Sequence, residues 1–151
     1  MKNLSRDRAF DDFSIGDTIQ SKGRTVTETD VVMFTGIAGI KAPIFVDAEH
    51  CKLHSPFGRR IVPGLLTAAI AAGMMEDVLG FFTVAALEIK EMKFPAPLFP
   101  NDTVSAQIHI VDTKPTSDGK HGVITVLNEL HNQGGVQVFE FTGKLLMKRV
   151  S

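Results

Sequence analysis

The sequence predicts an α+β fold in which an antiparallel sheet wraps around one long central helix. Two observations carry this prediction. One is a strongly apolar helical segment at residues 63–79, and the other is a change to period-two alternation that begins near residue 83 and continues to the end of the chain. Apolar side chains at alternate strand positions share one face of a sheet, and that face needs a covering layer. Since one apolar helix precedes four long strands, we expect the sheet to curve around it.

The central helix is expected to begin at Pro63 and to end before Gly80, because proline suits a first helical turn and glycine suits a helix end. The segment is apolar nearly all the way round, so we expect protein rather than water on every side of it. Its apolar stretch, residues 61–75, is shorter than the roughly 20 residues that cross a bilayer. We therefore interpret it as a buried helix.

The four strands are expected at residues 83–94, 104–110, 123–128 and 136–150, separated by turn signals at residues 95–101, 115–119 and 133–135. Such a sheet around one helix is the hotdog arrangement. A curved sheet on a single helix leaves a strand edge and a helix flank open. We therefore expect a homodimer joined through the sheet edges.

The first part of the chain is less regular. A strand is expected over residues 18–25, and the capping-box spacing of residues 27–30 predicts a short helix that runs to about residue 38. Residues 39–63 contain several glycines and prolines, so we expect an irregular segment with one helical turn at residues 47–53. Neither a repeat nor a linker interrupts the sequence, which predicts a single domain over residues 1–151.

Composition narrows the partners and the location. A net charge of −1 and a pI near 6.5 favour neither nucleic acid nor an anionic membrane as a partner. Cys51 is the only cysteine, so no intrachain disulfide can form and a reducing compartment is expected. The first residues include acids and no apolar stretch, which is unlike a signal peptide. A cytoplasmic location is therefore expected.

Several short runs resemble the MaoC-like, or (R)-specific enoyl-CoA hydratase, family, and they occur in the order that the family has. Residues 10–17 resemble its opening, residues 25–34 its first helix, residues 60–66 its turn into the central helix, and residues 94–104 a strand connection. The resemblance spans nearly the whole chain. It implies a hotdog domain that takes an acyl thioester of coenzyme A or of acyl carrier protein and adds or removes water across a double bond.

The sequence departs from the family at the catalytic pattern Gly-Asp-x-Asn-Pro-Leu/Ile-His-x-Asp. Residues 39–47 keep the two ends of that pattern and its proline. However, Ile40 stands where the catalytic aspartate would be, Ala42 replaces the asparagine, and Phe45 replaces the catalytic histidine. Hydration needs groups that take up and deliver a proton, and neither Ile nor Phe can do so. We expect little hydration and a dry pocket.

One element of the family site is retained. Gly64 is expected in the first turn of the central helix, next to Pro63, where unpaired N–H groups and the positive end of the helix dipole point outward. The resemblance implies that the Gly64 N–H polarises the thioester carbonyl. A backbone donor survives side-chain replacement, so carbonyl binding can outlast hydratase activity.

Basic residues before the helix are candidates for the phosphates of coenzyme A. Arg59 and Arg60 carry guanidinium groups that match phosphate geometry, and Lys90 and Lys93 are weaker candidates. The alternative is that all four are solvated surface residues. Beyond the coenzyme A thioester itself, the sequence suggests no cofactor. His50 and His54 lack a third ligand at useful spacing, so no metal site is expected.

The leading hypothesis is a protein that binds an acyl thioester such as acyl-CoA. Two alternatives remain open. The chain could be a non-catalytic subunit that pairs with a paralogous hotdog subunit in a heteromeric dehydratase. It could also be a hotdog thioesterase in which Asp47, or with less support Glu76, activates water against the thioester carbonyl.

Overall fold

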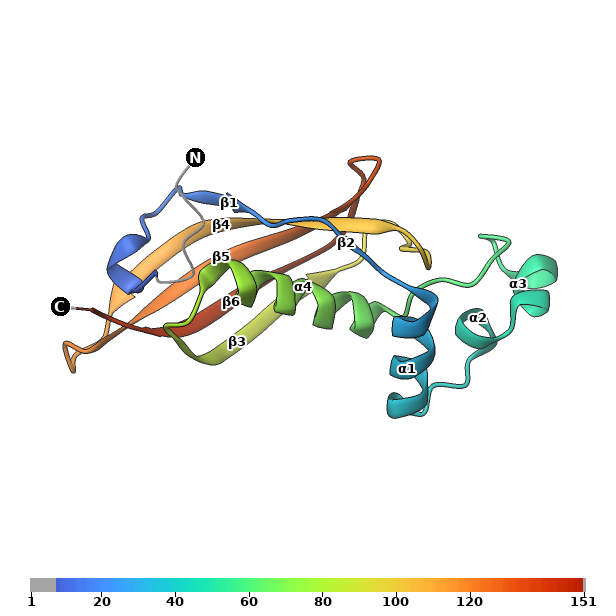
Figure 1. Ribbon diagram of the computed structural model, residues 1–151, viewed down its shortest axis with the longest axis horizontal. Coiled ribbons are helices and arrows are strands. Elements are labelled where there is room, and N and C mark those ends of the chain that lie inside the picture. Colours follow the sequence, from blue (N-terminus) through green and yellow to red (C-terminus); the bar gives the residue numbers. More distant parts are fainter. Residues whose placement is uncertain (1–7, 151) are drawn as a thin grey trace.

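A computed structural model describes residues 8–150, which form one curved sheet with a long helix on its concave side (Figure 1). The sheet is antiparallel, in the order β1-β4-β5-β6-β3, and β2 also pairs with β4. The strands are β1 (Thr18–Gln20), β2 (Arg24–Thr25), β3 (Thr83–Lys93), β4 (Thr103–Pro115), β5 (His121–Asn132) and β6 (Gln137–Lys148). The four long strands confirm the period-two prediction. The expected strand over residues 18–25 is instead two short strands, both on β4.

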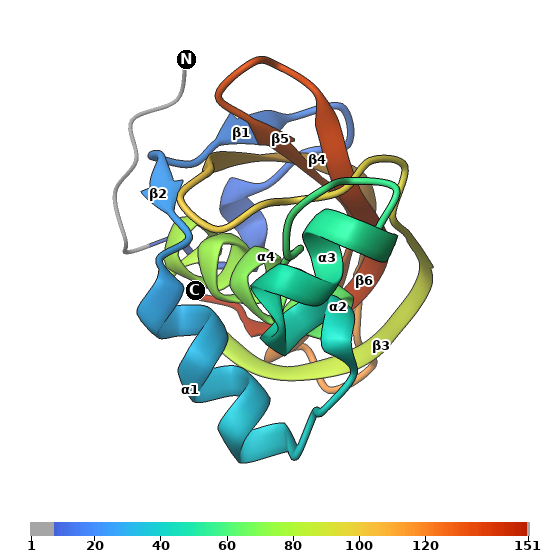
Figure 2. The ribbon, with the colours of Figure 1, turned by 90° about the vertical axis from the view of Figure 1, so that its right-hand side faces the viewer.

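The central helix, α4 (Gly64–Leu79), lies along the concave face of the sheet, and Figure 2 shows the sheet curling around it. The hotdog arrangement is therefore confirmed. Buried positions alternate strictly along β5, so every second side chain of that strand faces the helix layer. The core is formed where this face meets the helix residues Leu66, Ile70, Met74 and Val78.

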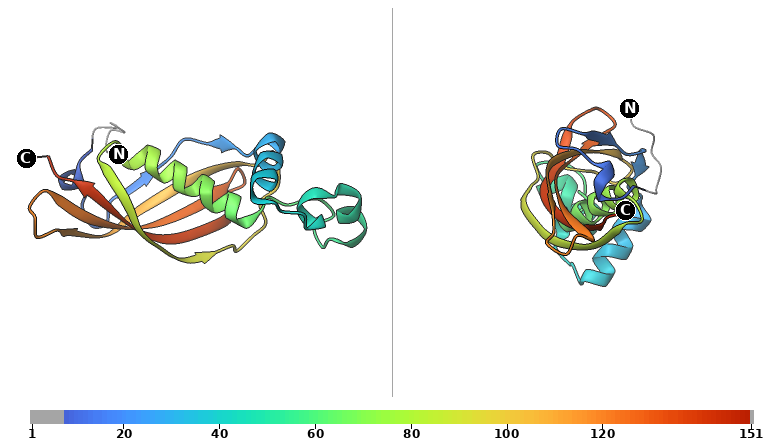
Figure 3. Two further views of the ribbon diagram at one scale, coloured as in Figure 1. Left: turned by 90° about the horizontal axis from the view of Figure 1, so that it is seen from below. Right: turned by 90° about the vertical axis from the view of Figure 1, so that its left-hand side faces the viewer.

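Three short helices project beyond the end of the sheet at which α4 begins (Figures 1 and 3). They are α1 (Glu28–Ala38), α2 (Pro43–Val46) and α3 (Ala48–His54). The predicted capping box is present at the start of α1, where Thr27 and Asp30 exchange hydrogen bonds of 2.9 and 3.1 Å. The hydrogen bond from the Thr27 backbone N–H lowers the pKa of the Asp30 carboxyl. Burial opposes this shift, and the hydrogen bond with the Thr27 side chain adds to it.

The irregular segment after α1 is more ordered than the sequence suggested. Only one helical turn was expected between residues 39 and 63, whereas two helices, α2 and α3, are formed there. Pro43 occupies the first turn of α2, where its missing N–H costs nothing. The Asp47 carboxylate accepts a 2.8 Å hydrogen bond from the His50 N–H and caps α3. A four-residue helix between two caps gives too short a pattern for periodicity to reveal.

One flank of the central helix is left open within this chain, as expected for a single curved sheet packed on one helix. Its face toward β4–β6 is buried, but Leu65 is 62% exposed and Ala69 and Gly73 are also open. The neighbouring edge strand β3 is exposed along almost its whole length. An apolar helix therefore has one flank that this single chain leaves uncovered. Within residues 8–150, no helix is long and apolar enough to span a membrane.

Candidate functional site

A cavity of about 470 Å³ lies where α4 begins, between the helix and the loop from β3 to β4. It is lined by Phe45, Phe57, Ile61, Val62, Gly64, Thr67, Phe94, Pro95, Ala96, Pro97, Leu98 and Val138. Two of the residues singled out from the sequence, Phe45 and Gly64, thus lie on one cavity, although they are far apart along the chain. Of the lining residues, Val62, Thr67 and Leu98 are buried, whereas Phe57 and Phe94 are exposed at 40% and 48%.

Gly64 presents its backbone to this cavity. It is the first residue of α4, Pro63 is the N-cap, and no side chain caps the helix. Among residues 8–150 no acceptor is found for the Gly64 N–H, whereas the Thr67 N–H donates to the Pro63 carbonyl oxygen at 3.1 Å. The free N–H lies at the positive end of the helix dipole, so this point of the cavity favours a partly negative oxygen.

The absence of a side chain at Gly64 also shapes the cavity. A Cβ atom added there would lie 3.0 Å from Cε1 of Phe94, closer than carbon atoms normally approach. The Phe94 ring is itself held against Phe139, with ring centroids 4.9 Å apart. The absence of a Cβ atom at Gly64 therefore allows the Phe94 ring to pack against the N-terminus of α4.

The rest of the lining is apolar. Of the lining residues, only Thr67 has a polar side-chain atom, and its hydroxyl donates to the Pro63 carbonyl oxygen at 3.4 Å. No described carboxylate or imidazole faces the cavity. General acid–base chemistry needs such a group within hydrogen-bonding reach of the reacting atoms. The arrangement can accept a carbonyl oxygen and a hydrocarbon, but it offers no proton-transfer group.

The other residues predicted at the site lie outside the cavity lining. Ile40 follows Gly39, which ends α1 in the left-handed conformation, and its N–H donates to the Thr35 carbonyl oxygen at 2.9 Å. Pro63 contributes its carbonyl oxygen to the first turn of α4. Asp47 caps α3 as described above, and its side chain does not line the cavity.

The remaining titratable candidates are also elsewhere. His50 and His54 face each other on exposed α3, with ring centroids 4.8 Å apart. Buried Cys51 directs its thiol to the carbonyl oxygens of residues 43 and 44. Glu76 is exposed near the far end of α4, where it borders a different hollow. No group of three potential metal ligands occurs within residues 8–150.

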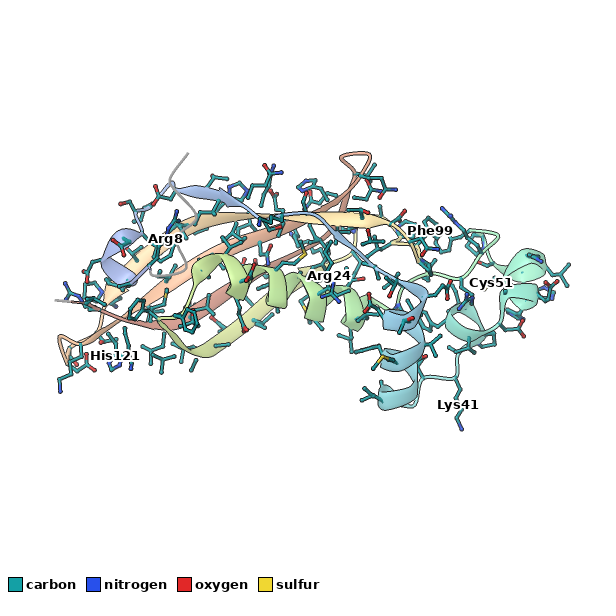
Figure 4. The ribbon with its side chains drawn as sticks, viewed as in Figure 1. Arg8, Arg24, Lys41, Cys51, Phe99 and His121 are labelled. Atoms are coloured by element: carbon teal, nitrogen blue, oxygen red, sulfur yellow. The ribbon has the colours of Figure 1, made fainter. Side chains whose placement is uncertain are left out.

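The two arginines before α4 differ in their surroundings. The Arg60 guanidinium is paired with both carboxylate oxygens of Glu28 on α1, at 2.8 and 2.9 Å. The Arg59 guanidinium lies over the Phe99 ring, with its carbon 3.5 Å from the ring centroid. Figure 4 places Phe99 at the end of the sheet from which α1–α3 project. Phe99 in turn meets Phe57, a lining residue, edge to face at 6.2 Å. Arg59 is thus held near the rim of the cavity.

The weaker basic candidates lie on the edge strand β3. Both Lys90 and Lys93 are exposed, and Lys93 forms a 3.2 Å ion pair with Glu140 of β6. The Gln137 amide, and after it Lys93, donate to Glu140 and lower the pKa of its carboxyl. Lys93 therefore has a partner within the sheet.

Sequence reasoning missed most of the cavity wall. The sequence predicts that Phe94 ends a strand and that residues 95–98 belong to a turn, yet all five residues from Phe94 to Leu98 line the cavity. Val138, from the start of β6, was not singled out either. The Phe-Pro-Ala-Pro run was the available signal, because two prolines restrict a loop to an extended path that can form a wall.

Comparisons with known proteins define the class of this chain. The family model described as "MaoC like domain" matches residues 12–132. The chain is 30% identical over 143 residues to the uncharacterised protein YdeM of Bacillus subtilis, covering 93% of this chain and 99% of the relative. It is 33% identical over 109 residues to the 3-hydroxybutyryl-CoA dehydratase of Methylorubrum extorquens, covering 70% of this chain and 66% of that enzyme. The solved structure of the monoamine oxidase regulatory protein from Archaeoglobus fulgidus superposes with a TM-score of 0.85 at 31% identity, covering 95% of this chain and 96% of that one.

The fold and the family match over residues 12–132 define a hotdog domain of the MaoC-like class. This chain belongs to the MaoC-like domain family. The resemblance inferred from its sequence runs is thereby confirmed.

Proposed function

We propose that this protein binds an acyl thioester of coenzyme A in the cavity at the start of α4 and performs little or no hydration. The observation that carries the proposal is the pairing of a free Gly64 N–H with a lining that is otherwise apolar. The N–H suits the thioester carbonyl oxygen, and the apolar wall suits the acyl chain. Support for a coenzyme A ester comes from the Methylorubrum relative, whose name specifies a CoA substrate.

Arg59 is the residue best placed to bind a phosphate of the carrier. The guanidinium of Arg60 already has a carboxylate partner, whereas that of Arg59 stacks on Phe99 and keeps its donors free of a carboxylate in the described structure. Stacking on an aromatic ring orients a guanidinium without using its N–H groups. The phosphate contact is therefore assigned to Arg59 rather than to Arg60.

The proposal predicts thermal stabilisation by acyl-CoA that depends on the Gly64 N–H. A ligand at about a hundred times its Kd should raise the Tm by about 5–10 °C for a chain of this size. Gly64→Pro removes the N–H but keeps a favourable residue for a first helical turn. It should weaken crotonyl-CoA binding about three- to tenfold relative to Gly64→Ala. Calorimetric titration of the two variants measures the ratio.

Gly64→Ala is the matched control, because both substitutions push a carbon atom toward Phe94 and only proline removes the donor. The backbone of Pro63 (φ −54°, ψ 134°) already has the extended conformation that precedes a proline. Free coenzyme A, which lacks the thioester carbonyl, should not distinguish the two variants. Equal affinity of both for crotonyl-CoA would refute the role of the N–H, and no binding of any acyl-CoA by the wild-type protein would refute the proposal.

A second copy of the chain is the proposed partner. The uncovered flank of α4, the edge strand β3 and the outer face of α1 all carry exposed apolar side chains, including Leu65 at 62%, Leu87 at 53% and Ile37 at 85%. Exposed apolar side chains beside an unpaired strand edge are typical of an interface between subunits. A paralogous hotdog subunit would meet the same surface.

We expect a homodimer in solution. Size-exclusion chromatography with light scattering should give twice the chain mass of 16.4 kDa. Leu87→Glu places a charge on the proposed interface and should shift the protein toward the monomer. Val111→Glu is the control, because Val111 has a similar exposure of 50% but lies on β4, away from this surface. A wild-type monomer at micromolar concentration would contradict the arrangement.

A further inference from the structure

The edge strand β3 has one short stretch on which a further strand could pair regularly. β3 is the last strand of the sheet, and within residues 8–150 no strand lies along its outer edge (Figure 1). Its pairing with β6 shifts register within residues 83–85, 86–88 and 90–93, so only residues 88–90 pair through three consecutive positions. Because a bulge twists a strand and disturbs its hydrogen-bond ladder, the stretch 88–90 is the part of the edge best suited to accept another strand.

This stretch carries opposite charges on either side of an isoleucine. Glu88 and Lys90 pair with outward-facing positions of β6, whereas Ile89 pairs with a position on the face toward α4. The two charged side chains therefore lie on the same, outer side of the sheet. The Glu88 carboxylate is 3.4 Å from Nζ of Lys144, but no carboxylate of residues 8–150 forms an ion pair with exposed Lys90. Lys90 thus offers a charge to a neighbour beyond the edge.

A second copy of the chain can pair with this stretch in one register that matches both charges. When two identical strands pair antiparallel, a two-fold axis relates them, and each contact between different residues occurs twice. With the axis at Ile89, Glu88 lies opposite Lys90 of the second copy, and Lys90 lies opposite its Glu88. An axis one residue to either side would place Glu88 or Lys90 opposite its own equivalent, and like charges directly opposite each other are destabilising.

We propose that Glu88, Ile89 and Lys90 set the register of an antiparallel β3–β3 pairing between two copies of this chain. The inference rests on the homodimer of the proposed function, to which it adds the axis and the ion pairs. These charges favour a second copy over a subunit that lacks them. Phe94, which lines the cavity, lies one residue beyond the end of β3, so the paired strands would extend almost to the cavity.

Charge reversal tests the register. Glu88→Lys turns both ion pairs into Lys–Lys contacts, and Lys90→Glu turns both into Glu–Glu contacts. Each variant should therefore dimerise about ten- to a hundredfold more weakly than the wild type. A mixture of the two variants restores opposite charges at both positions, so mixed dimers should outnumber the two homodimers together. Analytical ultracentrifugation measures the dissociation constants, and native mass spectrometry with one variant labelled with ¹⁵N measures the mixed fraction.

Lys144→Glu is the matched control. It changes the charge of the chain as Lys90→Glu does and removes the ion pair with Glu88, but it lies on β6, one strand in from the edge. Its dimer should be nearly as stable as that of the wild type, and its mixture with Glu88→Lys should give no excess of mixed dimers. If a reversed variant does not fold, Lys90→Gln should still dimerise about three- to tenfold more weakly than the wild type.

The inference is overturned if Lys144→Glu weakens the dimer as much as Lys90→Glu does. It is also overturned if the two reversed variants show no excess of mixed dimers, or if neither Lys90→Glu nor Lys90→Gln weakens the dimer. A dimeric wild-type protein with any of these results leaves the proposed homodimer intact and removes only the register. A monomeric wild-type protein removes both.

Discussion

The wild-type protein should hydrate crotonyl-CoA at least about a hundredfold more slowly than a family member that has Asp, Asn and His at the positions of Ile40, Ala42 and Phe45. Each general acid or base contributes about 10²–10⁴-fold to such a reaction, and none of these three side chains can transfer a proton. The cavity does not compensate, since its one polar side chain is the Thr67 hydroxyl, which is bonded to the Pro63 carbonyl oxygen.

The measurement follows the loss of enoyl absorbance at saturating crotonyl-CoA, with the intact-motif relative as the positive control. Thermal stabilisation by the same ligand shows that the assayed protein is folded and occupied. A turnover number in the ordinary enzyme range of roughly 1–10³ per second would show that other residues supply the acid and the base.

The same samples can be assayed for release of free thiol, which would indicate hydrolysis of the thioester. The sequence makes Asp47 the first candidate for that reaction. Its carboxylate caps α3 through the His50 N–H, and it does not line the cavity. The geometry therefore favours binding over hydrolysis.

Much of the fold could be predicted because its main signals are long. The strands β4, β5 and β6 are 12 or 13 residues long and each contains an extended stretch of alternation, and the sixteen residues of α4 are bounded by Pro63 and Gly80. The short helix α2 and the break between β1 and β2 involve only a few residues each. Segments of that length contain little more than one period of a helical or strand pattern, which is too short to identify it.

The site was predictable only in part, for a different reason. The place of Gly64 follows from a local rule about helix starts. That Phe45 and Gly64 line one cavity depends on the path of α2 and α3, which no local rule provides. Asn128 was visible in the sequence as a polar residue in phase with Ile124 and Val126. That its Nδ2 bonds the Ala71 carbonyl oxygen while its Oδ1 meets no donor from residues 8–150 depends on how α4 packs on the sheet.

Restoring the family's side chains should create activity. We expect the triple variant Ile40→Asp, Ala42→Asn, Phe45→His to hydrate crotonyl-CoA about a hundredfold faster than the wild-type protein. Position 45 lines the cavity, so an imidazole there would face a ligand held at Gly64. Position 40 lies just beyond the end of α1, outside the cavity lining. The carboxylate introduced by Ile40→Asp would therefore act by holding the water molecule that adds to the double bond. Because Ile40 and Phe45 are only partly buried, the stability cost should be about 1–3 kcal/mol.

Two further variants show whether the new activity uses the predicted geometry. Phe45→His alone should give a smaller gain than the triple variant, since it supplies one proton-transfer group instead of two. Adding Gly64→Pro to the triple variant should remove about 10²–10³-fold of the activity, the usual effect of losing a backbone oxyanion donor, while adding Gly64→Ala should cost much less. A folded triple variant that binds crotonyl-CoA and is no faster than wild type would show that residues 40 and 45 do not converge on the thioester. In that case the backbone of this chain, and not only its side chains, would differ from the family's catalytic arrangement.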